Sequence, residues 1–332
     1  MKATLRRVLR GRAVRTLLRG VERIDTRSRS TLRVLTYHTI TDALGFAEQV
    51  EHLVRHYQPV RGTDVVQAMN GDGELPSRAV LVTFDDADRS FAEVAWPLLK
   101  QAEVPVLLFV PTAYPDCAGN RFWWEDLTHA VLASEAKAVS DQGRTYPLGN
   151  ESERRAAIRA LKVHAHSHRP AEVRGWVAGL LEQLSVGPPP TTVVGWSTLR
   201  QLAAEGVEIG GHTRTHPFLD RLEGEALRGE IAGGLDDLEE KLGTRPQTFA
   251  YPYGRHDDAV VEAVRAASLS VAFTTVRGPN DLRRADPFRL RRINIGPAVG
   301  AGVLQARLLQ SSPRFGRHAA VPNQDTGPVL SS

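Results

Sequence analysis

The stretch Ala79-Val-Leu-Val-Thr-Phe-Asp-Asp-Ala-Asp88 carries the strongest fold signal in the chain. It opens with apolar, mostly branched residues, which is typical of a short strand covered on both faces, as in a parallel sheet. Asp85 and Asp86 follow at the end of this strand, and a helical pattern begins near Ser90. Active sites of α/β barrels lie at the carboxyl ends of strands, so the acid pair is a candidate site. Alternatively, Asp86 or Asp88 caps the following helix.

Similar apolar segments recur along the chain and alternate with helical patterns, which predicts repeated β-α-β units and an α/β barrel. The expected strands are 32–38, 79–82, 106–110, 207–211, 247–250, 270–275 and 289–295, and the expected helices are 46–57, 91–102, 199–204, 224–242, 259–267 and 304–309. Four segments are expected in the chain: a basic N-terminal segment 1–31, the barrel 32–298, a helical insertion within it at about 114–190, and a partly disordered tail 299–332.

Composition limits the possible partners and metal sites. The single cysteine, Cys117, excludes an internal disulfide and any metal site with several thiolates, so a metal would need Asp, Glu or His ligands. The net charge of +4 is uneven, because residues 1–33 carry +9 and the rest of the chain −5. An acidic body argues against a nucleic-acid groove, and we expect no nucleic-acid partner. Binding through the basic N-terminus stays open as an alternative.

The N-terminal segment has an amphipathic helical pattern over residues 12–24. Its apolar side is Val14, Leu17, Leu18, Val21 and Ile24, and its basic side is Arg12, Arg15, Arg19 and Arg23. Such a helix either docks on its own domain or lies on an anionic membrane surface. The sequence lacks the apolar core of a secretory signal and the ~20 apolar residues of a membrane-spanning helix. We therefore expect a cytoplasmic protein, with peripheral membrane contact as an alternative.

Two histidines four residues apart, His212 and His216, follow the expected strand 207–211. Imidazoles at this spacing can converge on one ion from a turn. One carboxylate would complete a three-ligand face with open positions for water, and neutral His suits a borderline divalent ion. The pair Asp85-Asp86 occupies a comparable place in the fold. The sequence therefore predicts a metal centre built from these two motifs.

Two further polar motifs follow expected strands. His38 comes at the end of the first strand, where it is either a hydrogen-bonded structural residue or a functional one. Tyr251-Pro-Tyr-Gly254 follows the strand 247–250. Its proline and glycine predict a tight turn with exposed backbone N–H groups, so it is either a candidate oxyanion donor or an ordinary turn.

The insertion at about 114–190 is predicted to be largely helical and to cover one rim of the barrel. It contains His164, His166 and His168, of which the first and last share a helix face at a spacing that metals can use. No carboxylate is expected to accompany them from a loop or a strand end. We therefore interpret these histidines as a solvated helix face.

Four motifs now stand in chain order: Leu35-Thr-Tyr-His38, Thr83-Phe-Asp-Asp86, His212-Thr-Arg-Thr-His216 and Tyr251-Pro-Tyr-Gly254. Over roughly residues 32–296 they resemble the polysaccharide deacetylase (NodB-homology) family, and the Asp and His motifs together are highly specific. The resemblance implies an α/β fold that is a distorted (β/α) barrel, here with a helical insertion. It also implies metal-dependent hydrolysis of N-acetyl groups on glycans.

Carried over residue by residue, the resemblance implies roles for individual side chains. The implied metal ligands are Asp86, His212 and His216. Asp85 resembles the general base, and the backbone N–H of Tyr253 falls where the family holds the oxyanion. Most members have their acid His in a late motif, which is missing here. A branch that includes biofilm poly-N-acetylglucosamine deacetylases places it on an early strand, and His38 matches that arrangement.

The chain departs from the family pattern at Ala250, where many members have an Arg two residues before the Pro of the third motif. Arg292 on the last strand is therefore the candidate to orient Asp85. The residues predicted to bind substrate are Tyr37, Pro252, Trp196 and Arg292. Trp196, together with Trp123 and Trp124, could stack on sugar rings, although packing in the core is the alternative.

The chemistry of amide hydrolysis agrees with this set of residues, because it needs an activated water, a base and an acid. The expected cofactor is a divalent metal ion, Zn²⁺, and the same ligands accept Co²⁺, Ni²⁺, Mn²⁺ or Fe²⁺. The expected partner is an N-acetylated oligo- or polysaccharide. Two alternatives stay open: a metal hydrolase of another amide or ester on the same barrel, and a non-catalytic glycan-binding relative.

Overall fold

The computed structural model describes residues 31–117, 121–187, 189–297 and 299–310. They form two units, which we call the barrel unit (31–115 and 194–310) and the insertion unit (116–193). The basic N-terminal segment that the sequence predicts, apart from Thr31, and the tail beyond residue 310 lie outside the described residues. None of the described helices combines the length and the apolar character needed to span a bilayer.

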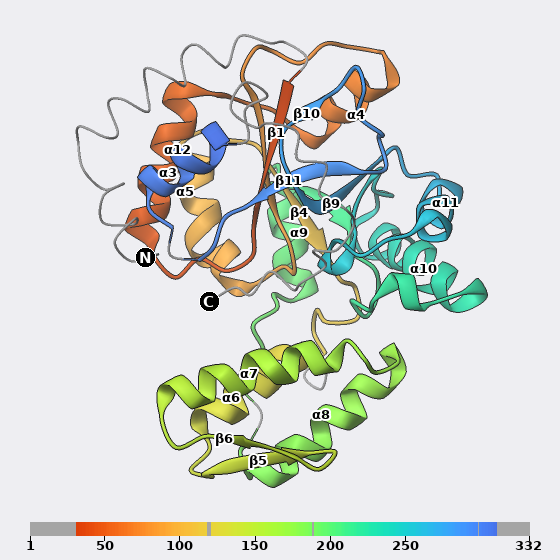
Figure 1. Ribbon diagram of the computed structural model, residues 1–332. Helices are drawn as coiled ribbons and strands as arrows, with labels where there is room; N and C mark the ends of the chain where they lie inside the picture. Colours follow the sequence, from red (N-terminus) through yellow and green to blue (C-terminus); the bar gives the residue numbers. More distant parts are fainter. Residues whose placement is uncertain (1–30, 118–120, 188, 298, 311–332) are drawn as a thin grey trace. The chain divides into compact units, whose positions relative to one another are not determined.

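Within the described residues, seven parallel strands of the barrel unit close into a ring (Figure 1). Each strand pairs with the next along the chain, and the first strand pairs with both the second and the last of the ring. The distorted (β/α) barrel is confirmed. In ring order the strands are β1 (Thr31–Tyr37), β3 (Ala79–Phe84), β4 (Val106–Val110), β7 (Glu208–Gly211), β8 (Thr248–Ala250), β9 (Val271–Arg277) and β11 (Leu290–Asn294).

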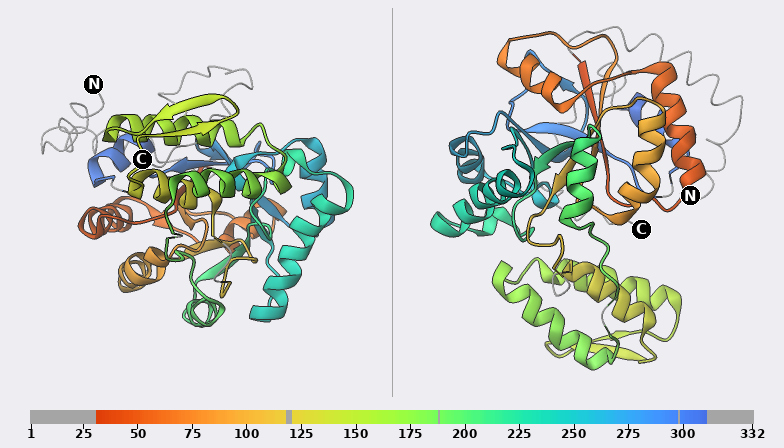
Figure 2. Two further views of the ribbon diagram at one scale, coloured as in Figure 1. Left: turned by 90° about the horizontal axis from the view of Figure 1, so that it is seen from below. Right: turned by 180° about the vertical axis from the view of Figure 1, so that it is seen from behind.

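Helices occupy the connections and lie outside the ring (Figure 2). Most elements that the sequence predicts are present with shifted ends, whereas the helix α4 was not predicted. The helices are α3 (Ala43–His56), α4 (Gly62–Asn70), a π-helical turn (Phe91–Ala95) that continues into α5 (Trp96–Gln101), α9 (Trp196–Ala204), α10 (Gly224–Leu242), α11 (Asp258–Ala266) and α12 (Ala301–Gln310). Short strands β2 (Gln58–Pro59) and β10 (Asn280–Asp281) add to β3 and β1.

Alternate side chains of the strands fill the inside of the ring, because successive residues of a strand point to opposite faces. Leu32 and Val34 of β1 belong to one apolar cluster with residues of matching parity on the other strands, among them Ala79, Leu81, Leu107, Phe109, Val271, Phe273 and Leu290. Residues of the other parity face the helices. The ring of Tyr37 stacks on Phe84 at 5.0 Å and meets Phe46 of α3 edge-on at 5.4 Å.

The insertion unit has an apolar core of its own. Its helices are α6 (Trp123–Ala133), α7 (Glu151–Ala165) and α8 (Pro170–Leu184). The structure adds a hairpin that was not predicted, β5 (Ala138–Asp141) with β6 (Arg144–Pro147). Gln142 and Gly143 link its strands with φ angles of 46° and 80°, which suits a two-residue turn that needs two positive φ angles.

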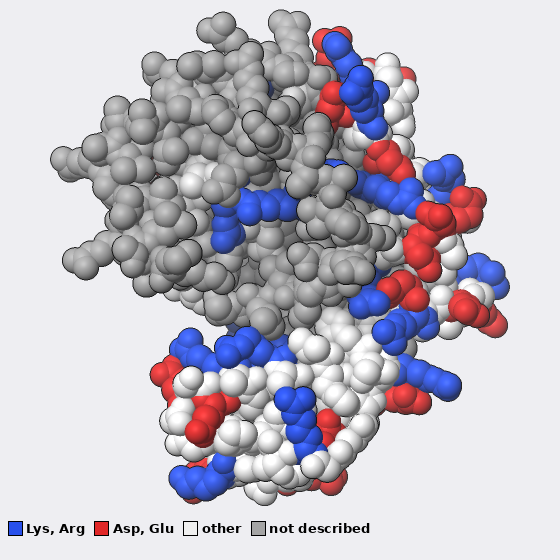
Figure 3. Space-filling view, viewed as in Figure 1, with Lys and Arg blue, Asp and Glu red and all other residues white. Residues whose placement is uncertain are grey.

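Charged side chains on the described surface of the barrel unit form mixed pairs. Arg245 Nη1 lies 2.6 Å from Asp236 Oδ1, and Arg289 Nη2 lies 2.6 Å from Asp258 Oδ1. Basic and acidic side chains alternate over α10 and α11 in Figure 3. Exposed pairs of this kind contribute about 0–1 kcal/mol each, so they balance surface charge more than they stabilise the fold.

Gly210 of β7 is required by the packing inside the barrel. A Cβ at this position would lie 2.5 Å from the ring of Phe109 and 2.7 Å from Thr248 Oγ1. We expect Gly210→Ala to lower the free energy of unfolding by about 1–3 kcal/mol through overpacking. Gly229, which is exposed in α10 and has no atom within 4 Å of an added Cβ, is the control. Gly229→Ala should raise the free energy of unfolding by about 0.5–1 kcal/mol. Urea unfolding measures both changes, and equal stability of Gly210→Ala and wild type would contradict the packing.

Candidate metal centre and active site

Asp85 and Arg292 meet inside the barrel, Asp85 directly after the last residue of β3 and Arg292 from the middle of β11. Arg292 donates from Nη1 to Asp85 Oδ1 at 2.7 Å and from Nη2 to Oδ2 at 2.8 Å. Its Nε donates to the carbonyl of Thr274 at 2.9 Å. Both residues continue the interior-facing alternation of their strands. Arg292, which the sequence analysis named as the candidate to orient Asp85, thus contacts both oxygens of that carboxylate.

Asp85 is a buried carboxylate beside a more accessible histidine. Burial alone would raise the pKa of Asp85, but Arg292, His212 and His38 together outweigh it and hold that pKa below its usual value. His38 Nε2 lies 3.8 Å from Asp85 Oδ2, and the His38 side chain is 36% exposed. Asp85 is therefore ionised at neutral pH and lies beside a histidine that a substrate can reach.

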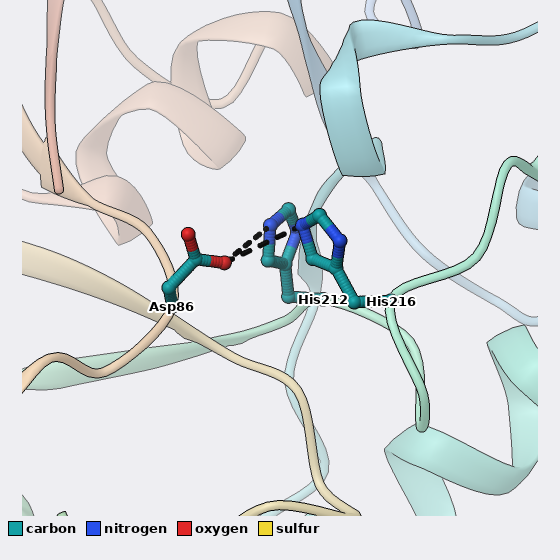
Figure 4. A group of neighbouring side chains, drawn as sticks. All are labelled: Asp86, His212 and His216. Carbon is teal, nitrogen blue, oxygen red and sulfur yellow. Dashed lines mark ion pairs between the residues drawn. The ribbon is translucent and has the colours of Figure 1, made fainter. Parts of the chain in front are cut away.

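Asp86, His212 and His216 form a compact group (Figure 4). Asp86 Oδ1 lies 3.5 Å from His212 Nε2 and 3.4 Å from His216 Nε2, and one ligand atom from each residue lies within 4.8 Å of the others. His212 Nδ1 donates to the carbonyl of Ala250 at 2.7 Å. That bond places the proton on Nδ1 and leaves a lone pair on Nε2, toward Asp86.

The electrostatics of this group differ from residue to residue. Burial would raise the pKa of Asp86, but His216, His212 and His38 hold it well below its usual value. Burial lowers the pKa of His216 to about 3 despite the nearby Asp86. Burial also acts to lower the pKa of His212, but Asp86 and Asp85 outweigh it and hold that pKa above its usual value. The group therefore offers one carboxylate, one imidazole that stays neutral and one that competes for a proton.

The backbone around the group is held in an unusual conformation. Asp86, Thr213, His216 and Tyr253 have φ angles of 72°, 67°, 56° and 58°. Non-glycine residues in this region are strained, and such strain is typical of functional sites. The Tyr253 ring lies 4.6 Å from the His216 ring, so the turn of the third motif adjoins the metal-ligand candidates. In the same turn a Cβ on Gly254 would lie 2.0 Å from Thr275 Oγ1.

All four residues predicted to bind substrate are buried in the fold. Tyr37 is 1% exposed, and its hydroxyl donates to Gln49 Oε1 at 2.8 Å. Trp196 is 8% exposed at the start of α9, and Pro252 is buried in the turn. Direct substrate contact by these buried side chains stays a prediction. Arg292 is also buried, but its contact with Asp85 ties it to the site.

The capping alternative applies to Asp88 and not to Asp86. Asp88 Oδ1 accepts a hydrogen bond from the backbone N–H of Ser90 at 2.9 Å, and its carbonyl accepts one from Phe91 at 2.9 Å. Asp86 instead turns toward the two histidines. The three acids of the motif therefore have three separate partners, which the sequence alone left open.

The interpretation of the insertion histidines as a solvated helix face is wrong. Asp141, at the end of β5, lies with Oδ2 3.5 Å from His164 Nε2, and its Oδ1 accepts from Trp176 Nε1 at 3.0 Å. The Trp176 ring also stacks on His168 at 4.8 Å. The sequence hides this carboxylate because β5 was not predicted.

Two carboxylates of α10 were also missed by the sequence analysis. Glu230 and Asp237 both accept hydrogen bonds from the loop that joins His212 to His216. Their spacing of seven residues puts them on one face of the helix, and that spacing is the only signal in the sequence.

Removal of Arg292 should destabilise the protein because it leaves Asp85 buried and unpaired. We expect Arg292→Met to lower the free energy of unfolding by about 3–5 kcal/mol at pH 7. The folded-state pKa of Asp85 is depressed, so the pair stabilises the fold above the unfolded pKa of about 3.9 and loses this effect as pH falls through the folded pKa. Denaturant unfolding at pH 7 and pH 3 should show the difference between variant and wild type shrinking in acid.

The matched control is the double variant Asp85→Asn/Arg292→Met, which removes both charges. It should recover part of the stability that Arg292→Met loses. If Arg292→Met unfolds like the wild type at pH 7, the pair does not stabilise the fold.

Two solved structures are similar to the chain over most of their length. The Streptococcus pyogenes deacetylase PplD, in complex with acetate, is 18% identical with a TM-score of 0.56, and the match covers 86% of this chain and 99% of that one. IcaB from Ammonifex degensii is 21% identical with a TM-score of 0.56, and the match covers 84% and 97%. At these identities the likeness shows a shared fold.

Two curated relatives match shorter stretches. Chitin deacetylase 1 of Cryptococcus neoformans var. grubii is 35% identical over 71 residues, which are 21% of this chain and 14% of that protein. The uncharacterized protein YlxY of Bacillus subtilis is 26% identical over 77 residues, which are 23% and 24%. The chain thus matches less than a quarter of the length of either relative.

The family model described as polysaccharide deacetylase matches residues 72–272. This range is more than half of the chain and contains the acid pair, the two histidines and the turn with Tyr253. The chain therefore belongs to the polysaccharide deacetylase family.

Proposed function

We propose that the chain is a metal-dependent hydrolase that removes N-acetyl groups from an N-acetylated glycan and releases acetate. The observation that carries the proposal is the group Asp86, His212 and His216 beside the Asp85–Arg292 pair. Membership of the polysaccharide deacetylase family supports the reaction type. The similarity to a deacetylase in complex with acetate and to a chitin deacetylase agrees with it.

The donor set fits a borderline divalent ion. Two ligands bound at ~2.1 Å lie about 3.0–3.4 Å apart, depending on the coordination geometry. Asp86 Oδ1 lies 3.5 and 3.4 Å from the two Nε2 atoms, which matches that spacing closely. Two imidazoles and a carboxylate suit Zn²⁺, which we expect, and also Co²⁺, Ni²⁺, Mn²⁺ or Fe²⁺. When bound, the ion supplies a Lewis acid that polarises the amide carbonyl and makes water more acidic.

The side chains around this group can carry the proton transfers of amide hydrolysis. Asp85 accepts the proton of the attacking water, and Arg292 holds both of its oxygens in place. The water oxygen adds to the carbonyl carbon, the C–N bond breaks, and His38 gives a proton to the leaving nitrogen. The products are acetate and the free amine. The backbone N–H of Tyr253 would stabilise the negative oxygen, and one such donor is typically worth ~3 kcal/mol.

The substrate side of the reaction lies next to His38 in this proposal, because the leaving nitrogen belongs to the sugar. A cavity of about 140 Å³ adjoins His38 and is lined by His38, Thr39, Thr41, Asn294, Ile295, Gly296 and Pro297. The glycan could approach His38 through this cavity. The lining residues do not indicate which sugar binds there.

Asp85→Asn should abolish acetate release while leaving the metal in place. Asparagine keeps the shape of the side chain but cannot accept the proton, and loss of a positioned general base costs about 10²–10⁴-fold in rate. The measurement is acetate release from N-acetylated oligosaccharides by chelator-stripped protein, with and without added Zn²⁺, together with the metal content of each variant.

Full activity of Asp85→Asn would sink the assignment of the base. Tight Zn²⁺ binding by the wild type without release from any acetylated sugar would favour another amide or ester substrate, or a glycan-binding protein without turnover. Acetate release that needs no divalent ion would contradict the metal-dependent mechanism.

Metal affinity should fall as the pH is lowered below neutrality. His212 must be neutral to bind an ion, and its raised pKa means that a proton competes for it at a higher pH than for an ordinary histidine. Asp86 and His216 have lowered pKa values, so protons compete less with the metal ion for these two residues. Zn²⁺ titrations between pH 5 and pH 8 measure the effect. An affinity that is constant across this range would contradict a role for His212 as ligand.

A further inference from the structure

We infer that Glu230 and Asp237 of α10 are positioning residues that hold the His212–His216 loop in the shape that brings its two imidazoles together. This inference rests on the metal-dependent function proposed above, since its consequence is a pre-formed metal site. Neither residue belongs to the four sequence motifs, and neither touches Asp86 or the imidazoles. Their hydrogen bonds are instead with two of the three residues between the histidines, Arg214 and Thr215, and with Thr112.

Glu230 accepts three hydrogen bonds from the middle of the loop. Its Oε2 accepts from the backbone N–H of Arg214 at 3.0 Å and of Thr215 at 2.8 Å. Its Oε1 accepts from Thr215 Oγ1 at 2.7 Å. Two successive N–H groups that point at one carboxylate fix the direction of the chain just before His216.

Asp237, two turns further along α10, binds the same loop through the side chain of Arg214. Its two carboxylate oxygens accept from Arg214 Nε at 2.8 Å and from Nη2 at 2.7 Å. Oδ2 also accepts from Thr112 Oγ1 at 2.6 Å. Thr112 follows β4, and its backbone N–H donates to the carbonyl of Thr213 at 3.1 Å. Asp237 therefore joins the loop, the end of β4 and α10 at one point.

Two glycines between these carboxylates let the loop lie directly on the helix. A Cβ on Gly234 would lie 2.9 Å from the backbone carbon of Thr213, and one on Gly233 would lie 2.8 Å from the Arg214 guanidinium carbon. Side chains at these positions would push the loop away. The segment from Glu230 to Asp237 thus has an acid at each end and two glycines in the middle. The missing side chains leave room for the loop to pack on the helix.

The loop needs such support because its backbone is strained. Thr213 and His216 have φ angles of 67° and 56°, which non-glycine residues adopt only when their surroundings impose it. Within the loop, the His216 N–H donates to Thr213 Oγ1 at 3.0 Å. Outside it, Tyr114 donates from its hydroxyl to the carbonyl of Thr215 at 2.9 Å. Glu230 supplies the acceptor for the remaining N–H groups of Arg214 and Thr215.

The test compares Glu230→Ala with two other variants, Glu230→Gln and Glu240→Ala. Glu240 is an exposed acid of the same helix that pairs with the adjacent Lys241. Zn²⁺ and Co²⁺ affinities are measured by chelator competition on the full chain, and the visible absorption of the Co²⁺ form reports the ligand geometry. Hydrogen exchange in metal-free protein follows the amides of Arg214 and Thr215. Thermal unfolding without metal shows whether the fold is kept.

We expect Glu230→Ala to bind metal about 10–100-fold more weakly, the range typical for loss of an outer partner of metal ligands. Its loop amides should exchange faster and its Co²⁺ absorption should change. Glu230→Gln keeps an oxygen for the two N–H groups and should restore most of the affinity, whereas Glu240→Ala should behave as wild type. Asp237→Asn, which weakens the Arg214 contact, gives a milder second variant if Glu230→Ala fails to fold.

Metal affinity in Glu230→Ala equal to that of Glu240→Ala would overturn the inference, as would unchanged exchange of the loop amides. A loss of thermal stability with wild-type affinity would overturn it too, because the residue would then serve only the fold. If the wild type itself binds no metal, the proposed function fails. The exchange of the Arg214 and Thr215 amides then decides by itself whether Glu230 holds the loop.

Discussion

Closure of the strand ring is the constraint on which the site depends. Because β1 pairs with both β3 and β11, side chains of matching parity on distant strands share one interior. His38 and Asp85 continue the interior-facing alternation just past the carboxyl ends of β1 and β3, and Arg292 belongs to the interior-facing set in the middle of β11. An open sheet with the same strands would leave Asp85 and Arg292 on opposite edges, and the buried ion pair would not form.

Two adjacent carboxylates coexist at the rim because the backbone sends them to different partners. Asp85 is bound by the Arg292 guanidinium, whereas Asp86, at a φ of 72°, turns toward His212 and His216. Each acid has its own partners that lower its pKa, so both stay ionised despite their burial. Different roles for neighbouring acids thus follow from environment, since their chemistry is the same.

The sequence predicted the barrel and the convergence of the acid pair with the two histidines because these depend on short-range patterns: apolar strands, and polar residues directly after them. The alternation that makes Leu32 and Val34 interior turns Tyr37 outward toward α3, where it packs on Phe46. The hairpin β5–β6 was not predicted from the sequence, because its turn is Gln142-Gly143 and lacks the Asn-Gly or Asp-Gly signal. The contacts of Glu230 and Asp141 depend on tertiary packing, which local sequence does not encode.

The partner of Asp85 lies 207 residues further along the chain, on the last strand of the ring. During synthesis on the ribosome, β1 and β3 therefore emerge long before the strand that completes the ring. Asp85 has no Arg292 to pair with until that strand is made. Contacts of such long sequence separation form late and slowly in folding. A nascent chain that stops short of β11 would contain the metal-ligand candidates but neither a closed barrel nor a paired Asp85. Closure of the barrel and pairing of Asp85 therefore become possible at the same moment.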